Sequence, residues 1–190
     1  MKPPIRYTGY TASDAGEMAR LLGKVFAKRD PPAVAVGLTP GEFAEFVQLW
    51  CGKAAEEGLT ILARCGETGD IVGAMLAEDS ASAMPAGLDG ISPKFLPILD
   101  LLGGLDAAYR ETHNPAPGET LHLFLLGVDE RFSGRGIAQQ LVQRAIANGE
   151  SKGYRLAVTE ATNLTSQHVF RKLGFTERVR ASYAGHRFEG

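Results

Sequence analysis

The sequence predicts a single mixed α/β domain that spans residues 1–190. The length of 190 residues suits one sizeable domain and is short for two. The composition, with 44% hydrophobic and 22% charged residues, is ordinary for a globular protein. Segments with helical and with strand spacing follow one another along the chain, with no internal repeat, low-complexity tract or linker. One sheet with flanking helices accounts for these observations.

The N-terminal segment predicts a short strand and a helix. Residues 5–7 are a strand candidate. Asp14 and Glu17 have the spacing of a capping box, and apolar residues then recur every three or four positions. The helix is expected to end near Lys28, because Pro31 and the proline after it cannot continue it.

A second helix is predicted to begin at Thr39, with proline at the first helical position and Glu42 at the third. Its apolar stripe ends at Trp50. We expect Trp50 and the phenylalanines around it to form core rather than an aromatic substrate cage. Two β-rich runs, 59–64 and 71–78, are joined by a glycine-containing turn and predict a hairpin.

The C-terminal half predicts a central strand among helices. Residues 121–128 are nearly all apolar, as in a strand that is buried on both faces. A leucine-rich helix is expected before it, with a potential break at Gly103-Gly104. The elements expected after it are a helix from Ile137 that closes at 149–153, a strand at 156–160, a helix at 165–173, a strand at 175–182 and a last one at 187–188.

The glycine-rich turn after the central strand is the most informative segment. Gly134, Gly136 and the small Ala138 would let an anion approach the N–H groups at a helix start. The dinucleotide fingerprint G-x-G-x-x-G fits badly because position 139 is Gln, and the triphosphate loop G-x-x-x-x-G-K-[ST] is absent. A turn that only reverses the chain is the alternative.

Residues 126–141 resemble the acetyl-CoA signature of the GNAT superfamily of N-acetyltransferases. Its core, [QR]-x-x-G-x-[GA], falls on residues 133–138, with Ser133 in the place of Gln or Arg. A second signature, which often reads N-x-x-A-x-x-L-Y-x-K-x-G-F, is similar to residues 163–175. The two motifs have the right separation, with a predicted strand between them.

The resemblance implies a GNAT fold, with a mixed sheet of about six or seven strands that splays between strands 4 and 5. Acetyl-CoA is expected in that cleft as the co-substrate, with its pantetheine arm on the central strand and its pyrophosphate on the glycine turn. The residues expected to bind it are Leu126, Gly127, Val128, Ser133, Gly134, Arg135, Gly136, Ile137, Ala138, Asn163, Ser166, Phe170 and Lys172.

In this superfamily the acetyl group usually passes directly to the amine, which must first lose a proton. His122 is one candidate base: strand alternation predicts that it shares a face with Phe124, Leu126 and Val128, and it is similar to a histidine of the vertebrate serotonin N-acetyltransferases. Asp30 is the other, in a segment that resembles F-x-x-x-E-P-L of the insect-type arylalkylamine N-acetyltransferases. The alternatives are a buried structural histidine, and an aspartate that caps a turn or pairs with a basic neighbour.

The acid that protonates the leaving thiolate is less defined. Phe170 stands where many members of the superfamily have a tyrosine. Ser166 and Tyr183 are the polar candidates, and Ser166 has an alternative role as a helix cap or a pantetheine contact. Thr162 and Ser166 match hydroxyl positions of the insect-type group.

Charge and composition exclude several classes of partner. The net charge of −2 gives no reason to expect nucleic acid or an anionic membrane, and no run approaches the roughly 20 apolar residues of a membrane helix. Cys51 and Cys65 are expected to be reduced thiols in a cytoplasmic protein. No metal site is predicted, because His113, His168 and His186 lack ligand spacing.

These observations predict an N-acetyltransferase that acetylates a primary amine of a small molecule, arylalkylamine- or polyamine-like. The alternatives are a protein or peptide amine as acceptor, and a non-catalytic acyl-CoA-binding regulatory domain. The helix at 93–102 is expected to be core or, as insertions at this point of the superfamily often are, a lid over the acceptor site. Dimers are common in the superfamily, so a homodimer is also open.

Overall fold

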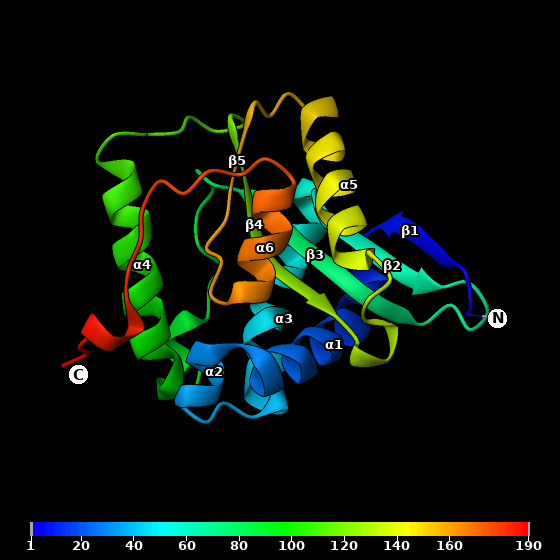
Figure 1. The fold of residues 1–190 in the computed structure, drawn as a ribbon, viewed down its shortest axis with the longest axis horizontal. Helices are drawn as coiled ribbons and strands as arrows, with labels where there is room; N and C mark the ends of the chain where they lie inside the picture. The colour runs from blue at the N-terminus through cyan, green and yellow to red at the C-terminus, as the bar shows by residue number, and fades with distance from the viewer. Residues whose placement is uncertain (1, 190) are drawn as a thin grey trace.

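A mixed five-stranded sheet lies at the centre of the computed structural model, which describes residues 2–189 (Figure 1). The strands lie side by side in chain order, antiparallel from the first to the fourth and parallel between the last two. They are β1 (Ile5–Gly9), β2 (Ile61–Cys65), β3 (Ile71–Asp79), β4 (Thr120–Val128) and β5 (Leu156–Val158).

Helices cover the two faces of the sheet and give each its own apolar core. One core is formed by α1 (Ala15–Arg29), α2 (Pro31–Ala35), α3 (Pro40–Glu57) and α4 (Leu96–Arg110) against one face. The other is formed by α5 (Ile137–Ser151) and α6 (Leu164–Lys172) against the opposite face. Figure 1 shows α4 standing at the left, on the other side of β5 from α5.

Of the two capping boxes predicted from the sequence, the structure contains one at the expected place and one that is displaced. The capping box at Thr39 is confirmed, with reciprocal hydrogen bonds at the start of α3. The box predicted at Asp14 and Glu17 is wrong by one turn: Thr11 and Asp14 form it, at a short 3₁₀ turn that precedes α1. Glu17 instead accepts a hydrogen bond from the N–H of Ile71 at 2.6 Å, and so ties α1 to the sheet.

The sheet has five strands in the described residues, and the expected six or seven is wrong. Neither 175–182 nor 187–188 is a strand. Most side chains from 176 to 189 are exposed, so this segment has no apolar face to bury on a sheet. It runs instead as an irregular strap from α6 across to α4, drawn in red in Figure 1.

Two helix boundaries also differ from the expectation. α4 continues through Gly103-Gly104 without a break. Each glycine costs a helix only about 1 kcal/mol, and the helix is held by packing of its apolar face. Pro31 and the proline after it do end α1, but they also open α2, where proline is tolerated in the first turn. Asp30 therefore lies at the junction of two helices.

Candidate active site

The site begins where β4 and β5 separate. The two strands pair over only three positions, from Thr120 to His122 on β4. At the fork, the hydroxyl of Thr159 donates to the carbonyl oxygen of Leu123 at 2.9 Å. Beyond it, one edge of β4 is left without a neighbouring strand and forms a wall of a cleft. The splay expected after the fourth strand is therefore present.

The cleft is partly open to solvent and lies between an apolar wall and a polar wall. The apolar wall comes mainly from α1, α3 and α4 and the segment before α4, and comprises Phe26, Phe43, Phe46, Phe95, Ile98, Leu99 and Leu102. The polar wall comes from the α1–α2 junction and the segment from β5 to α6, and comprises Asp30, Thr159, Glu160, Thr162, Asn163 and Ser166. The phenylalanines are thus core and cleft wall at once, and α4 covers one side of the cleft.

A β-bulge decides which way the residues of β4 point. Leu125 pairs with Leu76 and Leu123 pairs with Ala77, so Phe124 is left without a partner. A bulge shifts the alternation of side chains by one position. His122 therefore lies on the face of Phe124, and the prediction that it shares a face with Leu126 and Val128 is wrong, since these two pack in the core beneath α5.

His122 is held between two carboxylates. Its Nδ1 lies 2.9 Å from Oε1 of Glu78 on β3, and its Nε2 lies 2.8 Å from Oε2 of Glu160. Burial opposes the charged ring, but Glu160 and Glu78 together raise the pKa of His122 to about 10. Glu78 also accepts hydrogen bonds from Trp50 at 3.0 Å and Lys53 at 2.6 Å. At neutral pH this ring already carries both protons.

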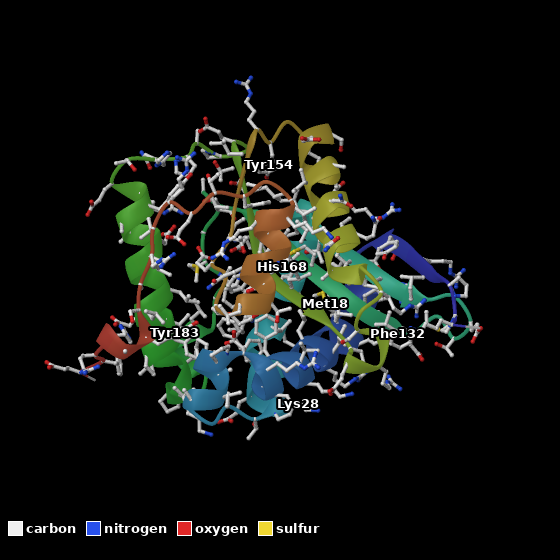
Figure 2. The ribbon with its side chains drawn as sticks, viewed as in Figure 1. Met18, Lys28, Phe132, Tyr154, His168 and Tyr183 are labelled. Atoms are coloured by element: carbon white, nitrogen blue, oxygen red, sulfur yellow. The ribbon has the colours of Figure 1, made fainter. Side chains whose placement is uncertain are left out.

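Asp30 meets a residue 132 positions away in the chain. Its carboxylate caps α2 by accepting from the N–H of Ala33 at 3.3 Å, and its other oxygen accepts from the hydroxyl of Thr162. The carbonyl oxygen of Thr162 in turn accepts from the hydroxyl of Tyr183, on the C-terminal strap (Figure 2). Burial raises the pKa of Asp30, against the hydrogen bonds from Thr162 and Ala33. Asp30 is only 6% exposed and lines the cleft.

Ser166 and Asn163 cap α6. Asn163 accepts from the N–H of Ser166 at 2.8 Å, and the hydroxyl of Ser166 donates to the carbonyl oxygen of Asn163 at 2.9 Å. Both residues line the cleft. Phe170 is buried edge-on against Phe175 and also reaches the cleft, whereas Lys172 is exposed at the end of the helix.

The glycine turn leaves an open cradle at the start of α5. Gly134 and Gly136 have φ of 73° and 71°, a left-handed backbone, and a Cβ on either would meet nothing within 4 Å. The first helical hydrogen bond runs from the N–H of Gln140 to the carbonyl of Gly136. The N–H groups of Ile137 and Ala138 therefore have no partner within the helix, at its positive end. These features fit a diphosphate.

Not every side chain of the turn faces this cradle. The guanidinium of Arg135 donates to the carbonyl of Pro3 and lies 5.5 Å from the ring of Phe132. Figure 2 shows Phe132 in the turn before α5, on the side of the molecule away from α4. Ser133 is exposed. The side chain of Arg135 is therefore held by Pro3 and Phe132.

Comparison with known families decides the class of the protein. The profile described as the acetyltransferase (GNAT) family matches residues 27–175, most of the chain. The chain belongs to the GNAT family. Members of this family take the acetyl group from acetyl-CoA, so the chain is an acetyl-CoA-dependent N-acetyltransferase.

Solved structures share the fold of this GNAT enzyme at low sequence identity. The C-terminal condensation domain of Ebony, in complex with β-alanyl-dopamine, has a TM-score of 0.83 at 14% identity, over 92% of this chain and 83% of that one. Arylalkylamine N-acetyltransferase 2 from Aedes aegypti has 0.76 at 23%, over 90% and 82%. The polyamine N-acetyltransferase of Drosophila melanogaster, which forms N-acetylagmatine, has 0.71 at 21%, over 90% and 82%.

The structure of this acetyltransferase brings together residues that sequence reasoning had kept apart, and adds others. Asp30, Thr162 and Ser166 line one cleft, while Glu78 and Glu160 were not singled out at all. Their only sequence signal is a carboxylate near the C-terminal end of an apolar segment, within β3 for Glu78 and just beyond β5 for Glu160. Within residues 2–189, no helix is long and apolar enough to cross a membrane, and no group of three or more His, Cys, Asp or Glu side chains is arranged to hold a metal ion.

Proposed function

We propose that this enzyme transfers an acetyl group from acetyl-CoA directly to a primary amine of a small molecule, arylalkylamine- or polyamine-like. The observation that carries the proposal is a buried carboxylate, Asp30, beside the hydroxyl of Thr162 in a cleft walled by phenylalanines. An aromatic wall suits an apolar or aromatic amine body, and a carboxylate suits its ammonium group. Solved relatives that act on arylalkylamines and polyamines have the same fold.

The glycine turn and the open edge of β4 are proposed to hold acetyl-CoA. Backbone N–H groups from Ser133, Gly134, Arg135, Gly136, Ile137 and Ala138 would receive the diphosphate, because the helix start offers a positive end and unpaired donors. The edge formed by Leu126, Gly127 and Val128 would pair with the pantetheine arm. Asn163, Ser166, Phe170 and Lys172 would contact it from α6.

Asp30 is the proposed base, in preference to His122. A ring that holds a proton on each nitrogen has no lone pair to accept another, whereas the Asp30 carboxylate accepts two hydrogen bonds and has a pKa that burial raises towards that of the amine. In the reaction the ammonium proton goes to Asp30, the neutral amine attacks to form a C–N bond, the C–S bond of the thioester breaks, and the second nitrogen proton is released to solvent. A backbone N–H near Leu126 would stabilise the oxygen that becomes negative.

The departing thiolate is proposed to take its proton from solvent. Phe170 has no proton to give, and the hydroxyl of Ser166 already donates to Asn163. A thiol has an ordinary pKa of about 8.5, so a thiolate is a tolerable leaving group near neutral pH. Ser166 thus serves to hold the start of α6 beside the cleft.

The test is release of free thiol from acetyl-CoA in the presence of an amine panel. The panel contains 2-phenylethylamine, tryptamine, agmatine, 1,4-diaminobutane, spermidine and a lysine peptide. Turnover with one of the small amines, abolished in Asp30→Asn, supports the proposal. Turnover with the peptide alone would change the acceptor class. Saturable binding of coenzyme A without turnover on any amine would favour a regulatory acyl-CoA-binding domain.

A further inference from the structure

Two strands and the segment after a third contribute to one buried charge cluster beside the acceptor cleft. Glu78 on β3 and His122 on β4 are cross-strand partners, and Glu160 lies just beyond β5. The exposed fractions of the three side chains are 9%, 17% and 21%. Buried charges are stable only when paired, so the pairing inside this cluster decides what charge remains for a ligand.

The pairing follows from the distances. A carboxylate accepts hydrogen bonds, so contacts of 2.9 Å and 2.8 Å from the two ring nitrogens to Glu78 and Glu160 place a proton on each nitrogen of His122. Glu78 has a second cation, because Nζ of Lys53 lies 2.6 Å from its other oxygen, and Lys53 also approaches Glu57 at 4.0 Å. His122 is the cation that faces Glu160.

Glu160 is the only member of this cluster that is part of the described cleft wall. It lies two residues before Thr162, whose hydroxyl is bound to Asp30. Two residues span at most about 7 Å of chain. Glu160 therefore lies on the same cleft wall as Asp30, and the chain segment between Glu160 and Thr162 has about the length of a diamine of three to five carbons.

We propose that His122 is a specificity-determining residue, which neutralises Glu160 from within the protein and so makes the cleft select monoamines over diamines. By pairing with Glu160, the ring supplies the positive charge that the second ammonium group of a diamine would otherwise bring to this carboxylate. With Glu160 matched by His122, and Glu78 by Lys53, Asp30 is the one carboxylate of the cleft wall left for an ammonium group. His122 acts on the acceptor through Glu160. This inference rests on the proposed function.

The experiment compares 1,4-diaminobutane with n-butylamine, which differ by one ammonium group. The measured quantity is the ratio of kcat/KM for the diamine to kcat/KM for the monoamine. If turnover is slow, both amines are tested as inhibitors of 2-phenylethylamine acetylation, and the inhibition constant of the monoamine is divided by that of the diamine. His122→Gln keeps a polar side chain but removes the charge and frees Glu160. We expect the ratio to rise at least tenfold, mostly through KM of the diamine, and to return to within about threefold of wild type in His122→Gln/Glu160→Gln.

A folded His122→Gln variant with an unchanged ratio would overturn the inference, as would a gain that survives in the double variant. If His122→Gln does not fold, the charge of the ring is measured in the wild type by NMR of ¹⁵N-labelled histidine. Two protonated nitrogens at pH 7 support the inference, and a neutral ring refutes it. Failure of the wild type to acetylate any amine of the panel would refute the proposed function instead.

Discussion

Asp30→Asn separates chemistry from structure at the proposed base. Asparagine caps a helix about as well as aspartate, so its side-chain oxygen can still accept from the N–H of Ala33, and its amide can still bond to Thr162. What it cannot do is accept the amine proton. General base catalysis contributes about 10²- to 10⁴-fold, so kcat/KM should fall by that factor while the affinity for coenzyme A is retained.

The pH dependence of the free energy of unfolding also distinguishes Asp30→Asn from the wild type. Burial raises the pKa of Asp30 above its ordinary value near 3.9, so the folded state binds this proton more tightly than the unfolded state does. The contribution of Asp30 to the free energy of unfolding therefore falls as pH rises from about 3.9 through the raised pKa. Asparagine removes this fall, so at pH 7 Asp30→Asn should be at least as stable as the wild type in urea unfolding.

The matched control is Asp30→Ala. It removes the same proton acceptor but also the cap of α2, so it should lose activity equally and about 1 kcal/mol of stability, a drop in Tm of about 2–4 °C. The assay is thiol release from acetyl-CoA between pH 5 and pH 9 with the best amine of the panel. The wild-type rate should decline as Asp30 becomes protonated at low pH. An Asp30→Asn rate within about threefold of wild type across this range would refute the reasoning.

Three further predictions concern the cradle, the sheet and the buried ring. Gly136→Ala should cost about 1–2 kcal/mol of stability and weaken coenzyme A binding, measured by calorimetry, at least tenfold. The control is Gly69→Ala, which has the same left-handed strain in a distant hairpin and should leave coenzyme A binding unchanged. Equal losses of affinity in the two variants would contradict the prediction. Gly127→Ala should cost about 1–3 kcal/mol in urea unfolding, because its Cβ would lie 2.7 Å from Cδ2 of Leu22. The pKa of His122 is raised from 6.5 to about 10, so its contribution to stability is complete below pH 6.5 and is lost towards pH 10. Wild-type unfolding energy should thus fall more steeply over this range than that of His122→Gln, by up to about 1.4 kcal/mol per pH unit, and parallel curves would exclude a charged ring.

The backbone of the glycine turn, where acetyl-CoA is proposed to bind, could be predicted from the sequence because its signals are local. A strand, two glycines and a helix start within a dozen residues define the turn near Gly136. In the structure both glycines of the turn have a left-handed backbone, and a Cβ on either would meet no atom within 4 Å. The cap of α6 by Asn163 is equally local, since it joins residues three apart. The residues proposed to act on the acceptor amine, Asp30 and His122, appeared in the sequence only as separate candidates, because their hydrogen-bond partners are remote in the chain.

Single residues show why the rest escaped prediction. His122 was assigned to the wrong face because a bulge at Phe124 interrupts an alternation that looks regular in the sequence. The sequence of 175–182 predicts a strand, but within the described residues this segment pairs with no other strand, and most of its side chains are exposed. Bulges and strand partners depend on how whole elements pack, and propensity along one segment does not contain them.

The sequence by itself determined the family signature, the alternation of helices and strands, and the backbone shape of the turn before α5, because steric limits and hydrogen-bonding needs of neighbouring residues fix such features locally. Only the tertiary structure decided that Asp30 meets Thr162, and that His122 joins Glu78 on β3 to Glu160 beyond β5. Charge is the physical reason: a carboxylate's pKa and its freedom to act depend on burial and on the ions beside it, and those neighbours come from distant parts of the chain.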